Sequence, residues 1–177
     1  MEIKTRRLYI RNLRPTDWLQ MKNIFVDFNN SKYAIYDTPL PMDDKNIKEL
    51  TGKFAESNLF YAILRQECPE MLGYVCFHKN EDKYDLGYCF HSKNHGEGYA
   101  LESCQALMEY LQKQYAVKIF TAGTAMENTP SCNLLSKLGF ECKSTEILSF
   151  HKDSLGNEIR FQGGDFVCLV GLVLNES

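Results

Sequence analysis

The chain has 177 residues, of which 44% are hydrophobic and 24% are charged, and its net charge is −3. This length suits one domain with a substantial core, so we expect residues 1–177 to form a single domain. The slight negative charge argues against general attraction to nucleic acid, and no apolar run approaches the roughly 20 residues of a membrane span.

The N-terminal residues lack the apolar core of a signal peptide. The seven cysteines are scattered along the chain without a C-x-x-C pair. Isolated thiols in apolar settings, odd in number, are typical of reduced core residues rather than of disulfides or a zinc site. We therefore expect a cytoplasmic protein that works without a membrane, nucleic acid or a bound metal.

The first half of the chain predicts a strand, two helices and then three strands joined as hairpins. Thr16 precedes an apolar stripe typical of a helix and is its expected N-cap, and Asn29-Asn30 ends that helix. After a loop, Asp43 or Asp44 caps the second helix. The predicted strands span residues 5–11, 59–64, 72–78 and 84–91, with a turn over 67–70.

The second half begins with a long helix. Apolar residues from Leu101 to Tyr115 recur every three or four positions, which predicts one buried helix face. A short strand over 117–121 follows it. Because a helix separates this strand from the one over 84–91, we expect the two strands to be parallel.

The last helix has clear end signals. Thr129 fits the N-cap, Pro130 the first helical position and Gly139 the left-handed residue after the helix. Two strands follow, over 146–152 and 159–172, and the second places on one face Phe166, Cys168, Val170 and Leu172. The element order β-α-α-β-β-β-α-β-α-β-β predicts an α/β protein with a mixed sheet.

The most informative stretch joins the strand over 84–91 to the helix near Leu101. Gly96 and Gly98 turn the chain there. A helix start presents several backbone N–H groups without partners, and the helix dipole adds positive potential. The turn is therefore a candidate anion site, best suited to a phosphate or pyrophosphate.

Two nucleotide motifs fit this turn badly. A P-loop needs Gly-Lys-Ser/Thr, but Gly98 is followed by Tyr99 and Ala100. A Rossmann turn needs a third glycine or alanine, but Leu101 stands at that position. It also needs an acidic residue at the end of the next strand, and that strand ends with Thr121-Ala-Gly-Thr124. These residues alone leave open the alternative that the glycine turn binds no ligand.

Three segments carry a resemblance to a known family. They are Lys93-Asn-His-Gly-Glu-Gly-Tyr-Ala100, then Asn128-Thr-Pro-Ser131 with Leu134-Leu-Ser-Lys-Leu-Gly-Phe140, and the opening Thr5-x-Arg7-Leu8-x-Ile10-Arg11. Together they resemble the GNAT superfamily of acetyl-CoA-dependent N-acetyltransferases. The first segment is similar to its pyrophosphate loop, and the opening resembles the RimJ/RimL-type branch, which acetylates ribosomal-protein N-termini. The resemblance covers essentially the whole chain and implies a GNAT-like mixed central sheet with helices on both faces.

The resemblance implies acetyl-CoA as co-substrate, with no metal. It implies backbone contacts of the pantetheine arm with Phe90 and His91. It also implies that the pyrophosphate and neighbouring groups contact Lys93, Gly96, Glu97, Gly98, Tyr99, Ala100, Asn128, Ser131 and Asn133. Two residues depart from the family pattern. Lys93 replaces an Arg or Gln, which keeps charge but loses bidentate geometry, and Leu135 replaces a tyrosine that protonates the leaving thiolate in many relatives.

Acetyl transfer requires a neutral amine and relief of charge on the departing sulfur. A carboxylate, directly or through water, usually takes the proton of the alkylammonium. Asp85 stands where some relatives have a catalytic glutamate, and its alternative role is a solvated strand carboxylate. Ser131 is a candidate donor to the thiolate, or else an ordinary residue of its helix.

We therefore expect an acetyl-CoA-dependent N-acetyltransferase that moves an acetyl group by direct transfer to a primary amine, on a protein N-terminus or a small molecule. The alternative is a non-catalytic acyl-CoA-binding sensor or interaction module on the same fold, which the leucine at position 135 keeps open. The identity of the amine and the oligomeric state, monomer or homodimer, stay open.

Overall fold

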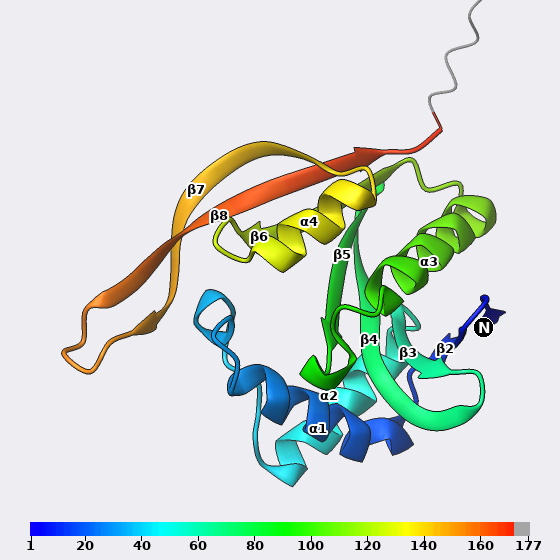
Figure 1. Ribbon diagram of the computed structural model, residues 1–177, viewed down its shortest axis with the longest axis horizontal. Helices are drawn as coiled ribbons and strands as arrows, with labels where there is room; N and C mark the ends of the chain where they lie inside the picture. Colours follow the sequence, from blue (N-terminus) through cyan, green and yellow to red (C-terminus); the bar gives the residue numbers. More distant parts are fainter. Residues whose placement is uncertain (172–177) are drawn as a thin grey trace, which may run out of the picture.

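The computed structural model describes residues 1–171, so the position predicted for Leu172 lies outside the described residues. The described chain forms one eight-stranded sheet in the order β1-β2-β3-β4-β5-β6-β8-β7 (Figure 1). All pairs of neighbouring strands are antiparallel except β5 and β6. The strands are β1 Glu2–Lys4, β2 Leu8–Asn12, β3 Phe60–Arg65, β4 Cys68–Asn80, β5 Lys83–Phe90, β6 Ile119–Ala125, β7 Glu141–Lys152 and β8 Glu158–Leu169.

Helices cover both faces of this sheet (Figure 1). Because side chains alternate along a strand, β3 contributes to two separate cores. Tyr61 and Ile63 pack in the core that includes α3 (Tyr99–Tyr115) and α4 (Thr129–Lys137). Ala62 and Leu64 pack in the core that includes α1 (Trp18–Asn29) and α2 (Asp44–Glu56). The short 3₁₀ helices are η1 Pro15–Asp17, η2 Ala34–Tyr36 and η3 Ser92–Asn94.

Every predicted helix and strand is present, but one short strand is additional and several strand boundaries differ. The short strand β1 was not predicted, because three residues are too few to show alternation. The turn expected over 67–70 is shorter, since β4 begins at Cys68, and the β3–β4 ladder is irregular beside it, which suits a strand that contains Pro69. β7 begins at Glu141 rather than 146 because it pairs with β8 along its whole length.

The helix starts show how side chains set boundaries. Asp43 caps α2 by accepting a hydrogen bond from the Asn46 N–H, which confirms one of the two predicted caps. The predicted cap Thr16 is wrong, because η1 precedes α1 there and Asp17 stands at the junction. The predicted cap Thr129 is also wrong by one residue, since the Asn128 side chain accepts from the Ser131 N–H at 3.3 Å.

Candidate active site

The glycine turn connects β5 through η3 to the start of α3. Gly96 and Gly98 have φ angles of +80° and +78°, and Gly98 is the N-cap of α3. Residues with a side chain pay a steric cost in this left-handed region, so the two glycines let the chain reverse within a few residues. The prediction that glycines turn the chain into this helix is confirmed.

The turn leaves a row of backbone donors free. Among residues 1–171, no hydrogen bond is made by the N–H groups of Gly96, Glu97, Gly98, Tyr99 and Ala100. The Glu102 N–H donates to the Gly98 carbonyl at the start of α3. Consecutive free N–H groups at a helix start form a concave anion site, to which the helix dipole adds positive potential. The geometry therefore suits a pyrophosphate.

Strands β5 and β6 diverge just beside this turn. They pair in parallel, as predicted, but only over Lys83–Asp85 against Ile119–Thr121. Beyond these residues β5 stays with β4 up to Phe90, while β6 stays with β8 up to Ala125. The edge of β5 over residues 86–90 consequently has no partner strand on the β6 side.

The hydrogen-bond pattern of β4 and β5 shows which groups this edge offers. The His91 N–H donates to the Leu72 carbonyl at 3.0 Å, so Phe90 and Gly73 face each other in a non-hydrogen-bonded pair. Residues in such pairs direct their backbone groups away from the partner strand, and every second residue does so. Tyr88 and Phe90 therefore present their N–H groups to the open side of β5.

A tyrosine and a serine meet across the gap between β5 and α4. The Tyr88 hydroxyl lies 2.7 Å from the Ser131 Oγ in a partly buried position, and either atom can donate. Burial raises the pKa of the Tyr88 phenol well above its usual range, and the hydrogen bond with Ser131 only partly offsets this. Tyr88 thus keeps its proton at neutral pH and can serve Ser131 as a neutral donor.

Asp85 lies on the other face of β5. It stands three positions before Tyr88, so the two side chains lie on opposite faces of the strand: Tyr88 on the face that α3 and α4 cover, and Asp85 on the face that α1 and α2 cover. The Thr121 hydroxyl donates to the Asp85 carboxylate at 2.8 Å, in the last paired register of β5 and β6. Asp85 therefore stands at the closed end of the gap, about 10 Å along the strand from Tyr88.

Comparison with known proteins identifies the family to which this arrangement belongs. The profile of the acetyltransferase (GNAT) domain matches residues 7–141. A Bacillus subtilis (strain 168) protein described as the uncharacterized N-acetyltransferase YnaD is 32% identical over 142 residues, which are 78% of this chain and 82% of the relative. The chain belongs to the GNAT acetyltransferase family.

Solved GNAT structures share the fold. One is RimL, a ribosomal L7/L12 alpha-N-protein acetyltransferase in complex with coenzyme A, at 15% identity and a TM-score of 0.79, covering 96% of this chain and 98% of RimL. Another is the spermidine N-acetyltransferase of Vibrio cholerae in complex with CoA and spermine, at 16% identity and a TM-score of 0.76, covering 93% and 96%. These likenesses confirm the predicted GNAT-like mixed α/β sheet with helices on both faces.

Three residues predicted for the GNAT cofactor loop already have partners within the chain. The Lys93 ammonium pairs with Glu70 of β4. The His91 N–H is bonded to Leu72, and its carbonyl accepts from the Asn94 N–H at 2.9 Å. The Phe90 carbonyl lies 2.8 Å from the His95 ring nitrogen, which leaves only the N–H of Phe90 on the open edge. A ligand contact with the His91 N–H requires its bond to Leu72 to break, whereas the Lys93 ammonium keeps further donors beside its pair with Glu70.

The remaining predicted residues lie around the start of α4. Asn128 is half-buried and uses its side-chain oxygen as the helix cap, whereas Asn133 is exposed. Leu135, which departs from the GNAT tyrosine, is 1% exposed and packs in the core beneath α3 and α4. Sequence reasoning missed Tyr88, whose only signal was strand alternation toward the same face as Leu86 and Phe90.

A separate polar cavity of about 380 Å³ opens between α1 and the ends of β4 and β5. Asp27, Glu70, His91 and Lys93 contribute its charged or titratable side chains, and neither Tyr88 nor Ser131 lines it. Among residues 1–171, no group of three or more His, Cys, Asp or Glu side chains is placed to hold a metal ion. No helix in the same residues is both long enough and apolar enough to cross a membrane.

Proposed function

We propose that this GNAT protein is an acetyl-CoA-dependent N-acetyltransferase that moves an acetyl group directly to a primary amine. The observation that carries the proposal is the row of unpaired N–H groups at residues 96–100 beside the unpaired edge of β5. The first fits a pyrophosphate, and the second fits the amides of a pantetheine arm. A coenzyme A molecule has both groups in one chain, which few other ligands do.

In this proposal the amides of Gly96, Glu97, Gly98, Tyr99 and Ala100 bind the pyrophosphate of acetyl-CoA. The edge of β5 then binds the pantetheine arm through the N–H groups of Tyr88 and Phe90. Asn128, Ser131 and Asn133, at the start of α4, add polar contacts from the opposite side of the gap. The thioester of bound acetyl-CoA supplies the acetyl group.

Ser131 is proposed to donate its hydroxyl proton to the departing sulfur. Tyr88 holds that hydroxyl at 2.7 Å and, as a neutral phenol, can return a proton to it. Because Leu135 is an apolar core residue, this pair replaces the tyrosine of other GNAT proteins. The proton lost by the amine is proposed to reach Asp85, which keeps one carboxylate oxygen free of its bond with Thr121.

The two solved relatives differ in their named acceptors, which are a ribosomal protein and a polyamine. Both acceptors are primary amines, so the proposal is stated for that class. It includes no nucleic acid and no membrane partner. A monomer and a homodimer are equally compatible with it.

The first experiment is a thermal-shift titration with acetyl-CoA, CoA and NADH. A ligand that binds the native state alone raises the midpoint as its concentration increases. We expect a rise with acetyl-CoA and CoA and none with NADH. The matched variants are Gly98→Val and Gly156→Val, because both glycines have positive φ angles but Gly156 lies in the β7–β8 turn. Only Gly98→Val should abolish the ligand-dependent rise, and an unchanged rise in that variant contradicts the loop assignment.

The second experiment measures release of free thiol from acetyl-CoA with a panel of primary amines. Thiol release that depends on the amine supports the transferase. Binding of CoA with no turnover of a peptide N-terminus, a polyamine or an amino acid would favour the sensor alternative. A pH–rate profile of Asp85→Asn that matches the wild type would remove Asp85 from the mechanism.

A further inference from the structure

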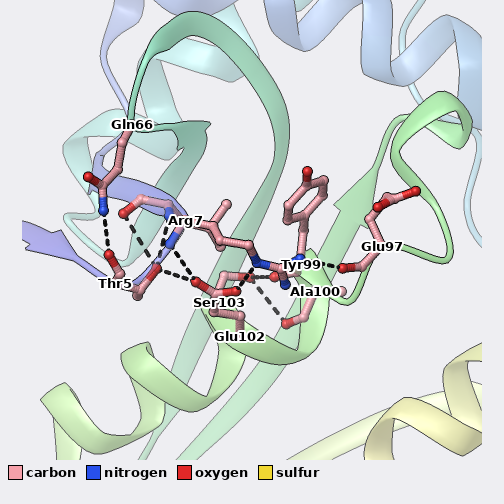
Figure 2. Close-up of polar contacts among 9 residues, drawn as sticks. Thr5, Arg7, Gln66, Glu97, Tyr99, Ala100, Glu102 and Ser103 are labelled. Atoms are coloured by element: carbon pink, nitrogen blue, oxygen red, sulfur yellow. Dashed lines mark hydrogen bonds and ion pairs between the residues drawn. The ribbon is translucent and has the colours of Figure 1, made fainter.

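An arginine from the start of the chain lies against the glycine turn. Arg7 occupies the β1–β2 turn, and its Nε donates to the Glu102 carboxylate at 2.7 Å. Its Nη1 donates to the backbone carbonyl of Glu97 at 2.8 Å, and its guanidinium lies over the Tyr99 ring at 4.8 Å from the centroid. Figure 2 shows this guanidinium between Glu102 on one side and the carbonyl of Glu97 on the other.

Glu102 in turn fixes the arginine. One carboxylate oxygen accepts from the Thr5 hydroxyl at 2.5 Å and from the Arg7 backbone N–H at 3.0 Å, and the other accepts from the Arg7 Nε (Figure 2). The Gln66 side chain donates to the Thr5 carbonyl, which ties the β3–β4 turn to the same network. Glu102 belongs to the first turn of α3, so this network ties the β1–β2 turn to the helix start.

The contact with Glu97 sets the direction of one amide in the row. A trans peptide unit is planar, and its C=O and N–H groups point in opposite directions. Because the Glu97 carbonyl points at Arg7, the N–H of Gly98 points away from Arg7 and stays available to a ligand. The Arg7 guanidinium also lies directly beside Gly98, since a Cβ there would be in ordinary van der Waals contact with the Arg7 Nη2 at 3.4 Å.

We propose that Arg7 and Glu102 form a clasp that holds the amides of residues 96–100 in the direction needed to bind the pyrophosphate of coenzyme A. This inference rests on the proposed function. Arg7 acts through the loop backbone and is a positioning residue. Glu102 pairs with the charge of Arg7, and Glu70 pairs with that of Lys93, so neither cation is needed as a direct ligand of the pyrophosphate in this proposal.

The test compares Arg7→Met with Arg6→Met. Arg6 lies in the same turn, is exposed and makes no hydrogen bond or ion pair to residues 1–171, so both variants lose one positive charge from one place. Dissociation constants are measured for CoA, dephospho-CoA and pantetheine. We expect Arg7→Met to weaken CoA and dephospho-CoA equally, by about tenfold, and to leave pantetheine unchanged, while Arg6→Met binds all three like the wild type.

Each other outcome overturns the clasp in a distinct way. Equal losses for all three ligands would make Arg7 a general structural residue. A loss for CoA but not dephospho-CoA would place Arg7 on the 3′-phosphate instead. Full CoA affinity in Arg7→Met would remove its role altogether, whereas a wild type that binds no CoA would overturn the proposed function itself.

A second pair of variants keeps the test informative if Arg7→Met unfolds. Arg7→Lys retains the charge but presents a single ammonium that cannot bridge Glu102 and the Glu97 carbonyl as the guanidinium does. Glu102→Gln retains the shape of the side chain and removes its charge. We expect both variants to weaken the binding of CoA about threefold or more and to leave the binding of pantetheine unaffected. The kcat at saturating acetyl-CoA should stay unchanged. A lowered kcat with unchanged KM would contradict positioning through the pyrophosphate.

Discussion

Tyr88→Phe should separate the two roles of this residue. The substitution keeps the aromatic ring in the core and removes only the hydroxyl that lies 2.7 Å from the Ser131 Oγ. Loss of one hydrogen bond of this kind costs about 1 kcal/mol of folding free energy, which lowers the melting midpoint by roughly 2–4 °C in a chain of this size. A positioned general acid contributes about 10²–10⁴ to a rate, so Ser131→Ala should lower kcat about a hundredfold or more.

The decisive comparison is the double variant, measured by steady-state thiol release with each enzyme saturated in acetyl-CoA. If Tyr88 acts only through Ser131, then Tyr88→Phe lowers kcat on its own and adds nothing once Ser131→Ala is present. Multiplicative losses in the double variant would show that the two groups act separately. A Tyr88→Phe enzyme with wild-type kcat would refute the proton path through this pair.

Three further predictions concern stability, each measured by urea denaturation. The buried Arg11 guanidinium donates two hydrogen bonds to Asp17 at 2.7 and 2.8 Å, so Asp17→Leu should cost about 3–5 kcal/mol, and adding Arg11→Met should recover much of it. Gly52 lies inside α2, and a methyl group there would have no neighbouring atom within 4 Å. Gly52→Ala should therefore stabilise the folded protein by about 0.5–1 kcal/mol. Burial raises the pKa of Glu102, but hydrogen bonds from Thr5 and Arg7 outweigh this and leave the pKa below its ordinary 4.5. The Glu102 carboxylate therefore stabilises the fold fully at a pH above its ordinary, unfolded-state pKa. This stabilisation is lost as the pH falls through the lower pKa of the folded protein. The difference in unfolding free energy between the wild type and Glu102→Gln should therefore become smaller as the pH is lowered. A difference that became larger would contradict this.

The sequence predicted the fold well where local chemistry decides it. The three-and-four spacing after Leu101, the glycine after α4 and the Asp43 cap each act over a few residues, and each matches the structure. Boundaries set by a distant partner were missed. The start of β7 depends on pairing with β8. Tyr115 was predicted on the buried stripe of α3, but it is the last residue of that helix and is 59% exposed.

The candidate site shows the same division. Gly96 and Gly98 could be predicted because a left-handed turn needs glycine at the position itself. The contact between Tyr88 and Ser131 could not, because it joins positions 43 residues apart and depends on how far β5 and β6 diverge. The contact of Arg7 with Glu102 was missed for the same reason, since the two residues are 95 positions apart in the chain.

The geometry of β5 also limits how Asp85 can act. Tyr88 and Asp85 point to opposite faces of the strand and lie about 10 Å apart along it, so no single atom can contact both groups. An amine close enough to attack a thioester beside Ser131 is therefore out of direct reach of the Asp85 carboxylate. Any proton transfer between them must pass through water within the gap that opens after Thr121. In the proposed mechanism, Ser131 on the α4 side of β5 therefore protonates the departing sulfur, and Asp85 on the opposite face receives the amine proton only through water.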